Sequence, residues 1–346
     1  MNTETTLGAL ALVFGVGLTA AAQKASPTKP DSAYVPGAYR IFAGTGAPAS
    51  IGDIVQAMGS RQVVFIGETH DDPTGHLLEL ELLKAAAAAY GAAAPSGAAR
   101  PIALSLEFFE RDVQLPLDEY LANLITESAF RADTRPWPRY ESDYRPLVEF
   151  AKGQNIPVIA ANAPRRYVTM VSRAGRDALN ALSAPALSFL PPLPYGKASP
   201  EYRGQWIAMM AEVMEQEGMK CGMPSPNAAA PHGSHQNMGN QLDSQVLWDA
   251  TMANSIARYL EQQPKGLVLH MVGGFHVERF TGTPEQLHAY APGARFLVVS
   301  LRPVDDVTKF EAAPAGAWGD FVIQTEKART LEEIECRQMR AKQAGK

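Results

Sequence analysis

Short segments that are apolar along their whole length recur through the chain and constrain its fold more than any other feature. Five of them lie at 63–67, 102–106, 156–161, 267–272 and 296–301, and a sixth candidate lies at 320–324. Strands buried on both faces of a parallel sheet read as continuous apolar runs of this length. Amphipathic stretches of helical period separate most of the runs. This alternation predicts an α/β fold with a mostly parallel sheet flanked by helices.

The spacing of the runs breaks once, because about a hundred residues between the third and fourth runs lack a strand pattern. Helical periodicity recurs there, at 168–182, 202–217 and 241–262. We therefore predict a helical insertion between the third and fourth strands, at about 165–262. The insertion belongs to a single α/β domain predicted over 51–330. A linker rich in Pro, Ala, Ser and Gly is predicted at 24–50, and a C-terminal tail at 331–346.

The N-terminus carries an unbroken run of apolar and small residues at 7–22. The run has about the length of a signal-peptide core and is too short for a comfortable membrane span. Ala20 and Ala22 precede Gln23 in the small-residue pattern that a signal peptidase accepts. Because no Lys or Arg precedes the run, a weak N-terminal anchor at 1–23 stays open beside a signal peptide. We expect an exported, periplasmic protein that lacks a lipoprotein Cys.

Composition and motifs exclude several common classes of protein. Hydrophobic residues make up 46% of the 346 residues and charged residues 19%, which is typical of a globular chain. The formal net charge is −5 and the basic residues are scattered, so no nucleic-acid partner is expected. The sequence has no Walker phosphate loop, no strand-linked glycine fingerprint and no nucleophile elbow. Whether Cys221 and Cys336 form a disulfide or stay as thiols is left open.

Polar side chains follow the predicted strands at the point where each strand ends. Glu68 and His70 follow the first strand, Glu107 the second and His276 the fourth. In open parallel sheets, ligands bind in the crevice at the carboxyl ends of the strands. The sequence therefore predicts that these four side chains gather at one functional site.

The residue types at this edge match a metal or cofactor site. Imidazole and carboxylate suit divalent transition metals such as Zn, Mn or Fe, so His70, His276 and Glu107 are predicted metal ligands. If the protein is a hydrolase, Glu68 or Glu107 is the predicted general base for a water molecule. A structural alternative exists for each residue taken alone: His276, for example, could be a partly buried histidine whose hydrogen bonds are satisfied. His76 and His270 are assigned structural roles, on the facing helix and inside a strand.

Other residues are weaker candidates for ligand binding. Arg165 and Arg166 follow the third strand, and their guanidinium groups could hold carboxylates, either those of Glu68 and Glu107 or those of a ligand. Tyr140 and Tyr144 are candidate phenolate ligands of haem iron, and packing aromatics otherwise. The segment 214–238 holds several Met and His residues and Cys221, which are soft ligands for copper or haem iron. Its alternative is a flexible edge of a lid, since Met is a common gap-filler.

Several blocks of sequence, taken in order, resemble the ChaN-like family of haem-binding uptake proteins. The blocks are VVFIGETHDDPTGH, LSLEFFERD, YRPLVEFAKGQNIPVIAANAPRR, LWDATMANSIA and VGGFHVERFTGTPEQL, and they span about 51–301. This family shares a superfamily with Tiki proteases and erythromycin esterases, marked by two Gly-x-x-His motifs and a Glu. The motifs match Gly67 to His70 and Gly273 to His276, and the Glu matches Glu107.

The resemblance implies a haem-binding protein of the periplasm or outer membrane that acts in iron acquisition, with homodimers enclosing haem and membrane uptake machinery as partners. It also implies that haem is held through a Tyr. The lipoprotein Cys of some family members is missing here. Tiki-like members use the matching His and Glu residues with a divalent metal to hydrolyse peptide bonds. The leading hypothesis is therefore an exported haem- or iron-binding protein, and the alternative is a metal-dependent peptidase or esterase that uses His70, His276 and Glu107.

Overall fold

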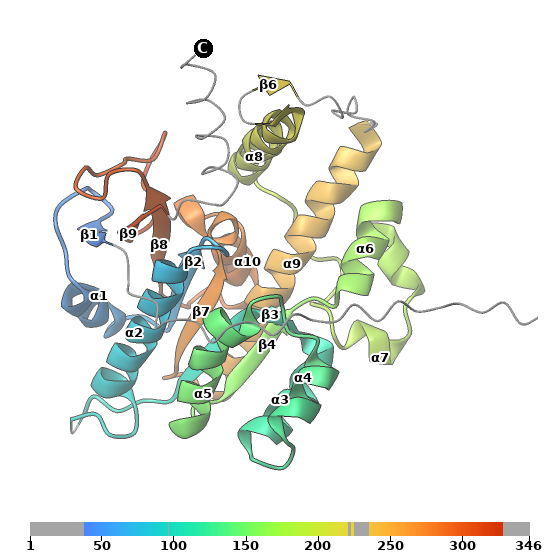
Figure 1. The fold of residues 1–346 in the computed structure, drawn as a ribbon. Coiled ribbons are helices and arrows are strands. Elements are labelled where there is room, and N and C mark those ends of the chain that lie inside the picture. Colours follow the sequence, from blue (N-terminus) through green and yellow to red (C-terminus); the bar gives the residue numbers. More distant parts are fainter. Residues whose placement is uncertain (1–37, 96, 221–222, 225–234, 328–346) are drawn as a thin grey trace, which may run out of the picture. The chain divides into compact units, whose positions relative to one another are not determined.

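The computed structural model describes residues 38–95, 97–220, 223–224 and 235–327 of the chain, and centres on a seven-stranded sheet (Figure 1). The strand order is β1-β9-β8-β2-β7-β3-β4, and every neighbouring pair is parallel except β1 with β9. The strands are β1 (Tyr39–Ala43), β2 (Val63–Glu68), β3 (Ile102–Glu110), β4 (Val158–Asn162), β7 (Leu267–Gly273), β8 (Phe296–Val304) and β9 (Phe321–Glu326). The predicted mostly parallel α/β sheet with flanking helices is confirmed.

Strand β1 lies where the sequence analysis places a linker. Residues 39–43 pair antiparallel with β9, so this part of the predicted 24–50 linker belongs to the sheet. Ile41 and Phe42 are buried in the strand. This five-residue run lies among Pro, Ala, Ser and Gly residues, and it joins the sheet through β9, near the other end of the described chain. Further backbone hydrogen bonds join it to residues 46, 47 and 49, just after the strand. Local composition cannot reveal the pairing with β9.

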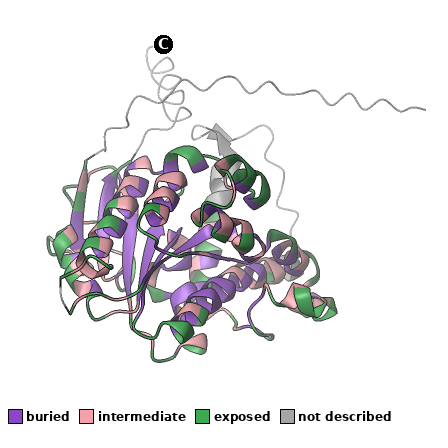
Figure 2. Cartoon of the chain, turned by 90° about the horizontal axis from the view of Figure 1, so that it is seen from below, coloured by how far each residue is buried: buried purple, intermediate pink, exposed green. Residues whose placement is uncertain are grey.

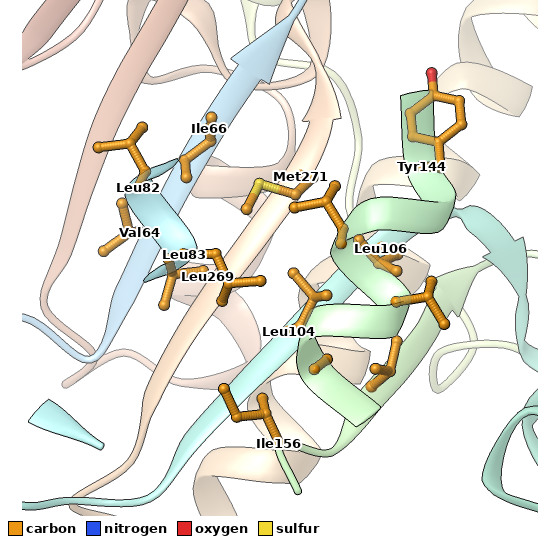
Figure 3. Close-up of a cluster of buried hydrophobic side chains, with 14 of the residues drawn as sticks. Val64, Ile66, Leu82, Leu83, Leu104, Leu106, Tyr144, Ile156, Leu269 and Met271 are labelled. Atoms are coloured by element: carbon orange, nitrogen blue, oxygen red, sulfur yellow. The ribbon is translucent and has the colours of Figure 1, made fainter. Parts of the chain in front are cut away.

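Side chains alternate between the two faces of the sheet, and helices cover both faces. Val64 and Ile66 of β2 point to one face, which packs against α1 (Ile51–Met58), α2 (Pro73–Tyr90) and α5 (Arg145–Gly153). Figure 3 shows this packing, with Leu82 and Leu83 of α2 among the strand side chains. The opposite face packs against α9 (His235–Gln262) and α10 (Thr283–Tyr290). Figure 2 shows the buried sheet between helices whose outer surfaces are exposed.

The segments after β3 and β4 are mostly helical. After β3 come η1 (Arg111–Val113), α3 (Gln114–Leu121), α4 (Glu127–Thr134) and the turn η2 (Tyr140–Tyr144). After β4 come α6 (Arg165–Ala174), η3 (Arg176–Ala181), α7 (Ala184–Leu187), α8 (Pro200–Gly218), the short strands β5 (Met219–Lys220) and β6 (Met223–Pro224), and α9. Side chains from α6, η3, α8 and α9 share a core of their own. Within the described residues, no helix is long and apolar enough to cross a membrane.

Several expectations concern residues outside the described ranges. They include the 1–23 leader, the 331–346 tail, Cys221 and Cys336. The structure describes no side chain between 213 and 237, so the predicted soft-ligand segment 214–238 is likewise outside it, apart from Met238 at its end.

Candidate functional site at the strand ends

Three adjacent strands bring the predicted residues to one edge of the sheet. β7 lies between β2 and β3, and Glu68 at the end of β2 is paired in register with Gly273 at the end of β7. From the other side, Glu107 of β3 reaches the same point, because its Oε2 accepts a hydrogen bond of 2.6 Å from the Gly273 amide. The turn η4 (Gly274–His276) then continues from β7 and carries His276. The strand order thus positions side chains that are more than 200 residues apart in sequence.

His70 lies at the exposed side of this edge, and a buried carboxylate sets its orientation. Its Nδ1 is 2.7 Å from Glu68 Oε1, and its side chain is 49% exposed, whereas that of Glu68 is 3% exposed. The Trp137 ring packs edge-on against the imidazole, with 5.0 Å between centroids. Burial lowers the pKa of His70, but the hydrogen bond to Glu68 and the charges of Glu107 and Glu68 outweigh burial and raise that pKa. Since Nδ1 faces Glu68, Nε2 is left for another partner.

His276 is held by a second buried carboxylate, Asp249 of α9. Nδ1 of His276 is 2.8 Å from Asp249 Oδ1, and Nε2 is 3.5 Å from Glu107 Oε1. Asp249 also accepts hydrogen bonds from the hydroxyls of Tyr202, at 2.5 Å, and Thr283, at 2.9 Å. Burial lowers the pKa of His276, but the charges of Asp249 and Glu107 raise it to about 9. Asp249 therefore fixes the ring so that Nε2 lies between Glu107 and the side-chain amide of Gln245, whose nitrogen is 3.1 Å from it.

The two imidazoles share one arrangement around Gly273. A Cβ on Gly273 would lie 3.0 Å from Nε2 of His70 and 3.5 Å from Oε2 of Glu107, so both groups lie against the glycine backbone. Each ring has Nδ1 held by a buried carboxylate and Nε2 on the side of Glu107. Histidines that bind metals usually show this carboxylate contact at the nitrogen that does not bind the metal. His70, Glu107 and His276 are thus brought together, and their role as metal ligands stays a prediction.

The other oxygen of Glu68 faces a group that the sequence analysis did not place in the site. His76 Nδ1 lies 2.9 Å from Glu68 Oε2 and 3.1 Å from Glu79 Oε2. His76 was expected to be structural, and it does lie on the facing helix, α2. His76 and Glu79 are three residues apart and therefore share a helix face. That spacing could have marked them as a pair, but nothing in the sequence shows that the face turns toward Glu68.

Asp249 is also absent from the sequence-based set. It lies in the middle of α9, where an acidic residue in an amphipathic helix normally indicates a solvated face. Here the carboxylate is fully buried, because α9 packs against the sheet and meets the η4 turn. Only the tertiary packing reveals its contact with His276. By contrast, the assignment of His270 to the core is confirmed, since its ring is fully buried and contacts Ser105 Oγ at 2.9 Å.

The tyrosines and Arg165 lie in different surroundings. Tyr144 is buried and donates a 3.0 Å hydrogen bond to Glu68 Oε1, and burial raises its pKa strongly. Tyr140 is buried nearby in η2, where its hydroxyl has no hydrogen-bond partner among the described residues. Arg165 is exposed at the first turn of α6. The neighbouring Arg166 pairs with Asp112 rather than with Glu68 or Glu107.

The fold and the strand-end site define an α/β domain with paired histidine and glutamate residues at the carboxyl edge of a parallel sheet. The family model described as "Haem-binding uptake, Tiki superfamily, ChaN" matches residues 54–287, which is most of the described domain. The chain therefore belongs to this ChaN family, as the sequence blocks predict.

Two known proteins illustrate the relationship. A structure described as cofacial haem binding to ChaN of Campylobacter jejuni is 15% identical, covers 83% of this chain and 97% of that one, and superposes with a TM-score of 0.58, which shows a shared fold. The chloroplastic protein RETICULATA-RELATED 5 of Arabidopsis thaliana is 23% identical over 270 residues, which is 75% of this chain. The chain spans only 34% of that curated relative.

Proposed function

We propose that this chain binds haem at the strand-end site, with Nε2 of His70 as the ligand of the iron. The observation that carries the proposal is the half-exposed imidazole of His70, whose Nδ1 is fixed by a buried carboxylate, in a chain that belongs to the ChaN family. A hydrogen bond from Nδ1 to a carboxylate orients the ring and makes Nε2 a better donor to a metal. Histidine is also the usual proximal ligand in globins and peroxidases.

The residues at the site fit haem better through His70 than through Tyr144. A tyrosine binds iron as a phenolate, so it must lose its proton. The hydroxyl of Tyr144 instead keeps its proton and donates a hydrogen bond to Glu68, and burial raises the pKa of Tyr144. His70 binds iron as the neutral imidazole, which can keep its proton on Nδ1 toward Glu68, so only an imidazolium has to lose a proton. Trp137 offers an aromatic surface beside it. When bound, haem would supply an iron centre, while Glu68 would hold the His70 ring and Glu107 would place a negative charge nearby.

The test is a titration of the purified chain with haemin, followed by the Soret band. The His70→Ala variant is expected to bind haemin at least about tenfold more weakly than the wild type, because the iron loses its ligand from the protein; this change corresponds to about 1.4 kcal/mol. His288→Ala is the matched control, since His288 is an exposed histidine on α10 and should leave the titration unchanged.

Two results would contradict this proposal. A wild-type chain that gives no Soret shift does not bind haem. A shift that survives His70→Ala but is lost in Tyr144→Phe or Tyr140→Phe would place the iron on a tyrosine, as the family resemblance implies.

We extend the proposal to an exported protein that acts in haem or iron uptake, as a homodimer in its haem-bound form and in association with membrane uptake machinery. The apolar run at 7–22 supports export, and family membership supports uptake. Cell fractionation with N-terminal sequencing tests export, where a chain retained whole in the cytosol would contradict it. Light scattering with and without haemin tests the dimer, where an unchanged monomer mass would contradict it.

A second candidate function is metal-dependent hydrolysis of a peptide or ester. It is favoured by one observation, namely that Glu107 lies between the two histidines, with Oε1 3.5 Å from Nε2 of His276 and Oε2 on the same side of Gly273 as Nε2 of His70. A divalent ion held there would act as a Lewis acid. Glu107 would be a ligand or base, and Glu68 would orient His70. Zn- or Mn-dependent cleavage that is lost in His276→Ala, by a chain that shows no haemin binding, would select this function.

A further inference from the structure

Behind the strand-end site lies a second group of ligand-type side chains, formed by Glu68, His76 and Glu79, which we name the inner triad. Glu68 comes from the end of β2, and the other two come from the first turns of α2. One potential ligand atom from each residue lies within 4.8 Å of the other two. The triad does not include His276 or Glu107, and it meets the strand-end site at two contacts, through the carboxylate of Glu68 and through His76 Nε2 at the backbone oxygen of His70.

The inner triad is buried, and two of its oxygen atoms have no hydrogen-bond partner. Glu68 is 5% exposed, His76 is 4% exposed and Glu79 is fully buried. Within the described residues, Glu68 Oε2 and Glu79 Oε1 accept no hydrogen bond. Buried carboxylate oxygens normally find a donor, because an unmatched one costs free energy. Glu68 Oε2 lies 2.9 Å from Nδ1 of His76 without hydrogen-bond geometry, and Glu79 contacts the same nitrogen through its other oxygen, Oε2, so each carboxylate keeps one oxygen that a further positive partner would satisfy.

The ring of His76 presents one nitrogen to two carboxylates. Nδ1 is 2.9 Å from Glu68 Oε2 and 3.1 Å from Glu79 Oε2, and only the contact with Glu79 has hydrogen-bond geometry. The opposite nitrogen, Nε2, is 3.1 Å from the backbone oxygen of His70, which can accept its proton. Without a metal, burial lowers the pKa of His76, but the contacts with Glu68 and Glu79 raise it to about 11, so an ion would have to displace the Nδ1 proton. With the remaining proton on Nε2, Nδ1 would offer a lone pair toward the same space as the two carboxylates. One nitrogen and two carboxylates then face one point.

The spacing and charge of these atoms suit a divalent transition metal. Two ligand atoms about 2.1 Å from an ion and roughly at right angles lie about 3 Å apart, close to the contacts around Nδ1. Imidazole with carboxylates is a ligand set for Zn, Mn or Fe. The nearby Asp143 Oδ2 forms ion pairs with Arg139 Nε at 2.7 Å and with His76 Nε2 at 3.5 Å, although among the described residues it too lacks a partner with hydrogen-bond geometry. Within the described residues no arginine pairs with Glu68 or Glu79, and the positive group that they share is His76. Burial and the charge of Glu68 raise the pKa of Glu79 to about 8, and a divalent ion in place of the His76 proton would balance both carboxylates.

We propose that the inner triad of Glu68, His76 and Glu79 binds one divalent transition-metal ion, distinct from any ligand at His70 and His276. This ion would hold Oε2 of Glu68 and so position Oε1, which contacts the imidazole of His70. The triad residues are positioning residues for the strand-end site. The proposal does not depend on haem binding, since it concerns the opposite oxygen of Glu68.

The experiment measures metal bound to the full chain after removal of metal with a chelator, reloading with Zn²⁺ or Mn²⁺ and dialysis. Elemental analysis of Glu79→Gln is expected to show a loss of about one equivalent relative to the wild type, or at least about a tenfold weaker affinity. Glu81→Gln is the matched control, because Glu81 is an exposed residue of the same helix. His276→Ala should keep the inner equivalent, which separates the triad from a metal at the strand-end site.

A second measurement needs no variant and covers the case in which Glu79→Gln does not fold. X-ray absorption of the Zn²⁺-loaded wild type counts the imidazoles around the ion. One imidazole with oxygen ligands is expected for the inner triad. Two imidazoles for the tightest-bound ion, no bound metal in the wild type, or equal metal in Glu79→Gln and Glu81→Gln would each overturn the proposal. A haemin titration has no bearing on any of these outcomes.

Discussion

The Gly67→Ala substitution is expected to lower the free energy of unfolding by about 3 kcal/mol, the upper end of the usual cost of overpacking a core. Gly67 lies in β2, whose two neighbours are β7 and β8. A Cβ there would lie 2.7 Å from Cγ2 of Val277 and 3.1 Å from the Cα of Gly274. Val277 is fully buried, so neither atom can move aside without shifting the η4 turn. Denaturant unfolding followed by circular dichroism measures the effect.

The matched control for Gly67→Ala is Gly204→Ala in α8, where a Cβ would meet no atom within 4 Å. Alanine in a helix is favoured over glycine by about 0.5–1 kcal/mol, so this variant should be unchanged or slightly more stable. If the two variants unfolded at the same denaturant concentration, the close approach of β2 to the η4 turn would not constrain the fold. The shift of the turn should also displace His276, because the turn carries it.

The Arg111→Met substitution is expected to cost about 3 kcal/mol of folding stability, since hydrogen bonds to a charged group are worth roughly 1.5–3 kcal/mol. Arg111 is buried just after β3. Its guanidinium donates to Ser255 Oγ, Thr251 O, Asn254 Oδ1 and Leu190 O, at 2.7 to 3.2 Å. It therefore joins the end of β3 to α9 and to the segment after α7. Methionine keeps the apolar stem but leaves these acceptors without their donor.

Arg165→Met is the control for Arg111, because Arg165 is exposed at the start of α6. A surface substitution of this kind usually changes stability by less than about 0.5 kcal/mol. Both variants lose one positive charge, so a change in net charge cannot explain a difference between them. Equal unfolding midpoints for the two would show that water can replace the guanidinium of Arg111.

The strands and the strand-end residues could be predicted because their pattern is local. Strands buried on both faces show as apolar runs, and Glu68, His70, Glu107 and His276 each come within a few residues of a strand end. Parallel strands put their carboxyl ends at the same edge, so the residues could be grouped without knowing the strand order. The order itself, with β7 between β2 and β3, is what places Gly273 beside both Glu68 and Glu107.

Residues whose role depends on how a helix faces the sheet could not be predicted. His76, Glu79 and Asp249 lie within helices. The helical periodicity of a sequence shows which residues share a helix face, but not which residues of the sheet that face contacts. The edge strand β1 was missed for a related reason, because its pairing with β9 joins the two ends of the described chain. Tyr144 was considered for its phenol, and the sequence could not show that its hydroxyl donates to Glu68.

The carboxylate of Glu68 belongs to two neighbourhoods at once, with one oxygen turned to His70 and the other to His76. A substitution at this position would disturb both, so it cannot reveal which neighbourhood matters for a given property. The two sites therefore have to be tested by substitutions at residues that belong to one site alone, His276 for the strand-end site and Glu79 for the inner triad. A ligand that binds one oxygen of Glu68 would also change the charge and the orientation of the other oxygen. This single side chain therefore links the exposed His70 to the buried His76.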